Sequence, residues 1–212
     1  HPSVSTAAPD TIKKLSAKAF SNAGLWCPHC SKQLNEELPS CPVCGFRLDA
    51  CSEILGNQAP QLDFLLDPGS SLPPDTGERL APAYQRLQRR FPQLALCLCF
   101  VELNPPLKPN ELAFWLMNTA PDATQRRAWT VTIVFEISRF EAGLSPGYAI
   151  EPFIKTDPWS ELLQSVTMKA QSEGWPAAME GLLGGIQPLL TLASKKARRR
   201  TKKVAAKSAN NR

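Results

Sequence analysis

Apolar residues recur with two different periods along the second two-thirds of the chain. In several stretches they return every three or four residues, as do Leu80, Tyr84 and Leu87, which is the period of a helix with one buried face. Elsewhere they form short continuous runs typical of buried strands, from Leu94 to Val101 and from Trp129 to Ile137. The pattern predicts helices at about 73–90, 111–118, 158–172 and 176–193, and strands at 94–101, 129–137 and 148–154.

The order of these elements predicts an α/β fold, a three-layer α-β-α sandwich. It runs helix, strand, helix, strand, strand, helix, helix, so that helices are available for both faces of one small sheet. Between the last two strands, the segment SRFEAGLSPG has the composition of a hairpin turn. Asp157 and Pro158 stand where an N-cap and a first helical residue are expected. Gly184, Gly185 and Pro188 should bend or weaken the last helix.

Ahead of this domain, two C-x-x-C pairs lie between residues 25 and 50. Cys27 and Cys30 form the first pair and Cys41 and Cys44 the second, and Gly45 follows as a residue that adopts positive φ at little cost. Two such turns can direct four thiolates at one zinc ion, in a closed tetrahedron without a position for a catalytic water. We therefore predict a structural zinc ribbon with one Zn²⁺ per chain. Two disulfides or four unrelated thiols are the alternatives.

Three further cysteines, Cys51, Cys97 and Cys99, make the total an odd number, seven. Cys97 and Cys99 lie on one face of a predicted strand and are badly placed to bridge each other, so we expect buried thiols. Unpaired thiols beside a zinc site favour a reducing compartment, and we expect a cytoplasmic protein. Because the chain begins at His1, export or membrane association after removal of a leader is the alternative. No window has the roughly 18 apolar residues of a transmembrane helix.

The net charge of +5 hides a strong asymmetry. Nine basic and no acidic residues lie from Lys195 to Arg212, which leaves −4 (+5 − 9) for the rest of the chain. Such a run is usually a solvated tail, but it can also bind nucleic acid, an anionic membrane surface or an acidic protein. The predicted organisation is a flexible lead-in (1–24), the zinc ribbon (25–50), a linker (51–60), the α/β domain (61–194) and a disordered basic tail (195–212).

Several phrases of the α/β region resemble the TPM domain, which occurs in a thylakoid lumen protein linked to photosystem II repair and in many bacterial proteins. The resemblance covers about Leu62 to Leu192. It is carried by the order and spacing of LLDPGSSLPPDTGERLAPAYQRLQ, LALCLCFVEL, WTVTIVFEISRFEAGLSPGYAIEPFIKTD and GWPAAMEGLLGGI rather than by one specific motif. The resemblance implies an α/β sandwich.

The same resemblance implies a candidate acidic site. Some family members are acid phosphatases or bind divalent cations through acidic residues at one end of the sheet, and Asp67 and Asp157 match family aspartates, with Asp122 nearby in sequence. Where the family has an acidic Asp-x-Gly entry to the central strand, this chain has Arg126 and Arg127, which would repel a cation. We therefore expect the aspartates to stabilise turns and cap helices.

These observations favour a non-catalytic protein, a protein-interaction or assembly and repair accessory factor. His1 and His29 are the only histidines, so the α/β domain has no histidine for general acid–base catalysis, and no Walker or Rossmann glycine motif is present. The alternative is a phosphatase-like hydrolase that uses Asp67, Asp122 or Asp157 with a divalent cation, and Arg126 or Arg127 to hold phosphate. The second alternative is binding of nucleic acid or an anionic surface through the basic tail.

Overall fold

The structure, a computed structural model, describes residues 25–26, 30, 32–34, 41–45, 47, 51, 54–56, 58–105, 107–122 and 125–209. The predicted lead-in (1–24) and Cys27 therefore lie outside the described residues. The strands are β1 (Leu25–Trp26), β2 (Gln33–Leu34), β3 (Leu65–Leu66), β4 (Ala95–Val101), β5 (Thr130–Glu136) and β6 (Glu141–Pro146). The α-helices are α2 (Thr76–Arg90), α3 (Pro109–Thr119), α4 (Thr156–Glu173) and α5 (Trp175–Ala209), with 3-10 turns η1 (Arg127–Trp129) and η2 (Glu151–Phe153).

Four strands form one mixed sheet in the order β3-β4-β5-β6. The pairs β3–β4 and β4–β5 are parallel, whereas β5 and β6 form an antiparallel hairpin. The parallel register places Ala95 beside Thr130 and Leu66 beside Cys99. β3, which the sequence pattern did not indicate, is only two residues long and forms one edge, and β6 forms the other.

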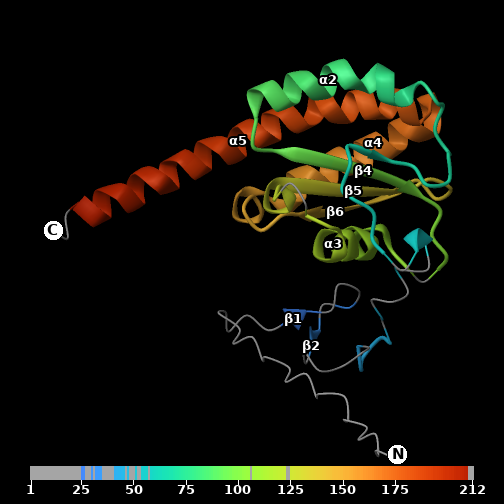
Figure 1. The fold of residues 1–212 in the computed structure, drawn as a ribbon, viewed down its shortest axis with the longest axis horizontal. Coiled ribbons are helices and arrows are strands. Elements are labelled where there is room, and N and C mark those ends of the chain that lie inside the picture. Colours follow the sequence, from blue (N-terminus) through green and yellow to red (C-terminus); the bar gives the residue numbers. More distant parts are fainter. Residues whose placement is uncertain are drawn as a thin grey trace, which may run out of the picture.

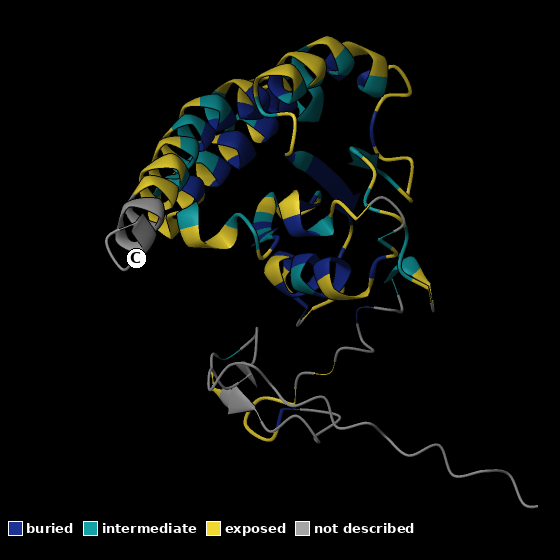
Figure 2. Ribbon diagram, turned by 60° about the vertical axis from the view of Figure 1, so that its left-hand side comes forward, coloured by how far each residue is buried: buried dark blue, intermediate teal, exposed yellow. Residues whose placement is uncertain are grey.

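The sheet lies between two layers of helices (Figure 1). On one face, Leu98, Phe100 and Ile133 belong to a core shared with α2, α4 and α5. On the other face, Cys99 and Val134 pack in a second core under α3. The buried residues of the helices face inward in Figure 2. The predicted three-layer α-β-α arrangement is confirmed, and burial on both faces explains why β4 and β5 read as continuous apolar runs.

The second strand of the hairpin lies earlier than we predicted. The chain reverses directly after β5, with Phe140 at a φ of 54°, and β6 runs through Glu141–Pro146, inside the segment that we had assigned to the turn. The predicted strand at 148–154 is wrong. A Cβ on Gly147 would lie 2.3 Å from the carbonyl oxygen of Arg127, so the chain needs glycine there as it leaves the sheet. It then forms η2, beginning at Glu151 and Pro152.

Helix α4 begins before Asp157, so the predicted N-cap role of this residue is wrong. Lys155 occupies the N-cap position with extended backbone angles, and Asp157 lies in the first turn, where its carboxylate suits the positive end of the helix dipole. Pro158 is also in the first turn, where its missing N–H has no partner to lose.

Helix α5 continues through most of the segment predicted to be a disordered tail. It extends from Trp175 to Ala209 without interruption at Gly184, Gly185 or Pro188, and its end projects beyond the α/β layers (Figure 1). From Leu189 to Ala209 the sequence has no glycine or proline and is rich in alanine, lysine and arginine, which are strong helix formers. The charge run therefore did not prevent helix formation. No described helix is long and apolar enough to span a membrane.

The described part of the predicted linker packs against the domain. Cys51 is fully buried and belongs to the core under α3, with Ile54, Leu55 and Ala59 packed at its margin. The Cys51 thiol lies 3.9 Å from the carbonyl oxygen of Glu111, the third residue of α3. The domain therefore begins before residue 61, the start that we had predicted.

Candidate functional site

The two cysteine pairs belong to different parts of the small module. Leu25 pairs with Leu34 and Trp26 with Gln33 in an antiparallel ladder, so the first pair lies in the connection between β1 and β2. The second pair lies in a turn in which the Gly45 N–H donates to the Cys41 carbonyl oxygen at 2.8 Å. Gly45 has a φ of 74°, and nothing lies within 4 Å of where its Cβ would stand. As we predicted, glycine is there for its backbone conformation.

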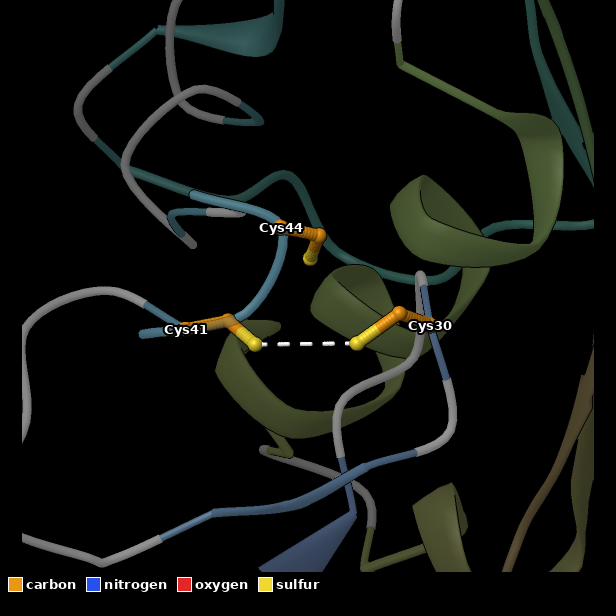
Figure 3. Close-up of side chains that lie close together, drawn as sticks. All are labelled: Cys30, Cys41 and Cys44. Atoms are coloured by element: carbon orange, nitrogen blue, oxygen red, sulfur yellow. Dashed lines mark hydrogen bonds between the residues drawn. The ribbon is translucent and has the colours of Figure 1, made fainter.

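Three of the four predicted ligands come together (Figure 3). The Sγ atoms of Cys30, Cys41 and Cys44 all lie within 4.8 Å of one another, and Cys30 and Cys41 are 3.6 Å apart. Two thiolates that bind one zinc ion tetrahedrally at about 2.3 Å stand about 3.8 Å apart, whereas a disulfide requires about 2.05 Å. The spacing of the two sulfur atoms therefore fits two ligands of one ion and excludes a disulfide between Cys30 and Cys41.

The surroundings of Cys41 favour its thiolate. Burial would raise the pKa of this thiol, but backbone N–H groups of Cys44 and Val43 and the thiols of Cys44 and Cys30 outweigh burial and lower the pKa to about 6. Thiolates are the form that binds zinc. The three described cysteines therefore have the donor type and the spacing of zinc ligands, Cys41 also has a thiol that ionises readily, and Cys27 is the candidate for the fourth ligand.

Asp67 has the turn-stabilising role that we expected. Its carboxylate accepts hydrogen bonds from the backbone N–H groups of Ser71 at 2.9 Å and Leu72 at 2.8 Å. Asp67 directly follows β3, so these bonds shape the loop that leads to α2. A carboxylate that accepts bonds from this loop has a structural role without a cation.

Asp122 also stabilises a turn, before β5. It accepts a hydrogen bond from the Arg127 backbone N–H at 3.0 Å, and its other oxygen lies 4.0 Å from the Arg127 guanidinium. The same guanidinium donates to the carbonyl oxygen of Ala120 at 2.8 Å, and that of Arg126 donates to Pro92 at 2.9 Å. Both arginines are thus bonded to the protein, which leaves them poorly placed to hold a phosphate.

The three aspartates do not converge. Asp67 follows the end of β3 that lies beside Cys99, whereas Asp122 precedes Thr130, which lies beside Ala95 at the other end of β4. Four residue steps of strand separate Ala95 from Cys99, a distance of about 13 Å. Asp157 is exposed on α4. Among the described residues, Cys30, Cys41 and Cys44 are the only group of three or more that could hold a metal ion.

The remaining cysteines are buried thiols, as we expected. Cys51, Cys97 and Cys99 are fully buried, and none of the three forms a disulfide with another described cysteine. Burial, and then the charge of Asp67, raise the pKa of Cys99 to about 12. Burial, and then Cys99 and Asp63, raise the pKa of Cys97 well above its ordinary value. The raised pKa values keep Cys97 and Cys99 protonated, which fits a packing role for these two thiols.

A groove follows the free edge of β6, a feature that the sequence analysis missed. The Gly147 N–H donates to the Thr130 carbonyl oxygen at 2.7 Å, so Thr130 and Gly147 are a hydrogen-bonded pair. Hydrogen-bonded and non-hydrogen-bonded pairs then alternate along the β5–β6 ladder. By this alternation, Gly143 and Ser145 bond to β5, and the N–H and C=O groups of Ala142 and Leu144 point to the free edge. The segment SRFEAGLSPG contains this strand, but its glycine and proline residues led us to predict a turn.

The groove has an internal volume of about 820 Å³ and lies between α3 and α4. One wall carries Lys108, Pro109 and Asn110 at the start of α3. The other carries α4 side chains, including Leu163 and Gln164. Gly143 lets the two elements meet, because a Cβ there would stand 2.1 Å from the Asn110 backbone nitrogen. No described strand pairs with this edge, which forms the floor of the groove, and helices from both layers form its walls.

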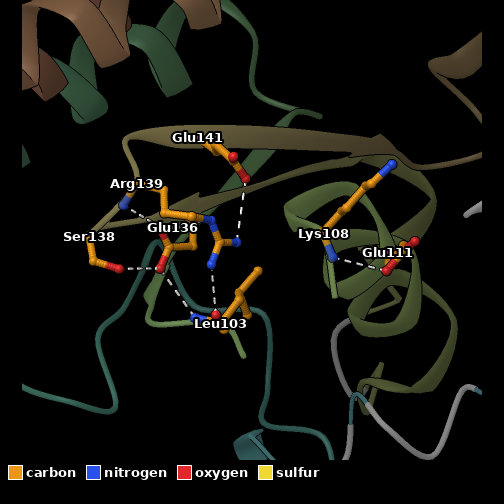
Figure 4. A network of polar contacts seen from close by, with 7 residues as sticks. All are labelled: Leu103, Lys108, Glu111, Glu136, Ser138, Arg139 and Glu141. Carbon is orange, nitrogen blue, oxygen red and sulfur yellow. Dashed lines mark hydrogen bonds and ion pairs between the residues drawn. The ribbon is translucent and has the colours of Figure 1, made fainter. Parts of the chain in front are cut away.

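A buried carboxylate fixes the hairpin beside this groove (Figure 4). Glu136 accepts hydrogen bonds from the Ser138 hydroxyl at 2.6 Å and the Leu103 N–H at 3.3 Å, and the Arg139 guanidinium donates to the Leu103 carbonyl oxygen at 2.8 Å. Burial would raise the pKa of Glu136, but the Ser138 hydroxyl, the Arg139 and Leu103 N–H groups and the Arg139 charge lower it. Because every described partner is internal, the network is structural.

The solved structures that are similar to this chain include two N-terminal domains. The N-terminal domain of a protein from P. gingivalis aligns over 61% of this chain and 83% of its own, at 10% identity and a TM-score of 0.49. The N-terminal domain of the cg2496 protein from Corynebacterium glutamicum aligns over 63% of this chain and 79% of its own, at 12% identity and a TM-score of 0.42. No family model and no curated protein matches the sequence.

Proposed function

We propose that this protein is a non-catalytic interaction protein in which a zinc-stabilised cysteine module accompanies a TPM-like α/β domain, and that the β6 groove binds an extended segment of a protein partner. One observation carries the proposal: the outward N–H and C=O groups of Ala142 and Leu144 form the floor of a groove. A strand edge with unpaired groups binds extended peptides by adding a strand.

The groove dimensions suit one peptide strand. Its volume of about 820 Å³ is in the range of pockets that enclose ligands. Helices α3 and α4 flank the edge, so a single strand has access and a second sheet with its own helices would meet these walls. The occupant is therefore a segment of four to six residues, about the length of β6 itself.

The walls define the chemistry of the segment. Leu144 and Leu163 lie on the side of α4, and Lys108 and Asn110 on the side of α3. Because alternate side chains of a strand point to opposite faces, a bound segment presents every second residue to α4 and the others to α3. On α4, Leu163 lies among polar side chains (Thr156, Ser160, Gln164 and Thr167), so small or β-branched residues suit that wall, and polar or acidic residues suit Lys108 on α3. Proline is excluded at the residues that bond to Ala142 and Leu144.

Hydrogen exchange by NMR tests the proposal on the free protein. The amide protons of Ala142 and Leu144 should exchange fast, while those of Gly143 and Ser145 are protected. A capped hexapeptide of alternating valine and threonine should protect Ala142 and Leu144, and the same peptide N-methylated at alternate residues should not. If Ala142 and Leu144 are already protected in the free protein, or if the two peptides act alike, the proposal is wrong.

A matched pair of variants separates docking from folding. Leu144→Pro removes an N–H that points outward and keeps the hydrogen bonds between β6 and β5. Strands tolerate proline at such an edge position. The variant should abolish the peptide effect. Tyr148→Ala, at a side chain that is 79% exposed, is the control and should bind the peptide like the wild type.

We propose that Cys27, Cys30, Cys41 and Cys44 hold one structural zinc ion. The spacing of the described thiols and the lowered pKa of Cys41 support this assignment, and four protein ligands would leave no open position for a reacting group. Native mass spectrometry before and after a chelator wash tests it. One tightly held zinc per chain is expected, and a protein purified without zinc would contradict the proposal.

No described contact favours the phosphatase alternative, since Asp67 and Asp122 bond to their own loops. We therefore expect no phosphate release from para-nitrophenyl phosphate with magnesium, calcium or manganese. Metal-dependent turnover that is lost in Asp157→Ala would replace the interaction role with hydrolysis.

A further inference from the structure

The basic end of α5, which begins at Lys195, is a cationic surface on a continuous helix. We infer that the helix from Lys195 onward binds duplex DNA by lying in its major groove. Six basic side chains are exposed there: Lys195, Lys196, Arg198, Arg199, Arg200 and Lys202. Within the part of the chain that the structure describes, none of the six takes part in an ion pair. The sequence has no acidic residue from Lys195 to Arg212 that could neutralise them.

The helix is held in place by the domain. Its earlier turns bury Met179, Leu182 and Ile186 in the main core, and Arg90 of α2 donates to the Thr191 hydroxyl at 3.4 Å. The basic segment continues the same helix without a break. A preformed helix has less conformational entropy to lose on binding than a disordered tail has. This distinguishes the segment from a solvated charge run.

The basic residues cover a broad arc of the helix. At 100° per residue, the six described residues span about 200° of the circumference. The opposite stripe continues the buried face of α5 with Ala197 and Thr201, and the sequence places Val204 and Ser208 at the next helical spacings. The helix therefore has a wide cationic side and a narrow side of small residues.

This distribution favours DNA over a membrane surface. A helix that binds an anionic membrane carries bulky apolar residues opposite its basic face, and from Ala193 to Ala209 the largest apolar residue is Val204. A broad cationic arc can instead contact the phosphates on both sides of a groove. A helix is about 10–12 Å across and the major groove of B-DNA is about 12 Å wide, whereas that of A-form RNA is too narrow.

The test is fluorescence anisotropy of a labelled 20-base-pair duplex with the full chain, as a function of salt. If about six cations contact phosphates, log K should fall against log salt with a slope of about −5. The variant Arg198→Glu/Arg199→Glu should lose at least about tenfold in affinity at low salt and reduce the slope by about two. Circular dichroism confirms that the variant keeps its helix.

A control variant with the same change in net charge distinguishes binding by the α5 surface from attraction by the overall charge of the protein. Arg86→Glu/Arg89→Glu changes two exposed arginines on α2 and should bind the duplex within about twofold of the wild type. Equal losses in the two double variants would overturn the proposal, because binding would then follow net charge alone. So would tighter binding to duplex RNA or to vesicles of phosphatidylserine and phosphatidylcholine, or no binding to DNA at 150 mM salt.

Discussion

The cysteine module (residues 25–47) and the α/β domain (residues 51–209) are stabilised in different ways. Of the module's described side chains only Cys41 is buried, and its sheet consists of two strands of two residues each. The domain has two cores, one on each face of a four-stranded sheet. If the module holds zinc as we propose, its fold depends on the metal ion, because a segment this small buries little apolar surface.

The largest expected effect concerns the module. Cys41→Ser, or removal of zinc by a chelator, should unfold the module, because structural zinc contributes about 10–16 kcal/mol in isolated zinc-finger peptides. The melting temperature of the domain should stay the same. Cys97→Ala is the converse control, since it removes a buried thiol from the domain and should leave zinc content at one per chain. Calorimetry with metal analysis checks both variants. If loss of zinc unfolded the domain together with the module, the two regions would not be stabilised separately.

The next effect concerns the main core. Leu182 is fully buried on α5, and Leu182→Ala should lower the free energy of unfolding of the domain by about 2–5 kcal/mol. Zinc content should not change, because the module shares no described core residue with α5. Urea unfolding followed by tryptophan fluorescence measures the first quantity. A variant with wild-type stability would show that the core on this face is not what holds the domain together.

Two glycines should respond with opposite signs. Gly143→Ala would place a Cβ 2.1 Å from the Asn110 backbone, so α3 must move away from β6 and stability should fall by about 1–3 kcal/mol. Gly184→Ala meets nothing within 4 Å inside α5 and should raise stability by up to about 1 kcal/mol. Thermal unfolding of the two variants checks the pair. Equal changes would mean that α3 and β6 are not in backbone contact.

The smallest effect concerns pH. The pKa of Glu136 is lowered from 4.5 in the folded state, so its stabilising contribution is complete above pH 4.5 and is lost as the pH falls through the folded value. Glu136→Gln should therefore cost about 1 kcal/mol at pH 7 and less at pH 3. Urea unfolding at the two pH values measures the difference. A cost that did not shrink at low pH would show that the charge of Glu136 is not what matters.

Much of the fold could be predicted from the sequence because it depends on local periodicity. The apolar runs of β4 and β5 and the three-to-four-residue spacing of α2 indicated the correct elements and their layers. The hairpin partner was misplaced because β6 contains Gly143 and Pro146, which are typical of turns. They are tolerated at a sheet edge, where Gly143 admits α3 and the missing N–H of Pro146 faces away from β5. Such positions depend on tertiary contacts.

The candidate site likewise has features that local sequence predicts and features that depend on the tertiary fold. The cysteine spacing indicated Cys30, Cys41 and Cys44 as neighbours, because two-residue turns impose that geometry. The separation of Asp67 from Asp122 depends on the parallel register of three strands, which no local pattern reveals. The basic helix was missed because we interpreted the charge run as a solvated tail, although its lysine, arginine and alanine residues have high helix propensity.

The burial of Cys51 limits how far the module can be from the groove. Cys44 and Cys51 are seven residues apart, so the chain between them reaches at most about 25 Å. The Cys51 thiol lies 3.9 Å from Glu111 on α3, whose first turn forms a wall of the groove. A partner strand in the groove that also touched the module would meet that second contact at an effective concentration in the millimolar range. Two weak contacts on such a short tether add up to avidity.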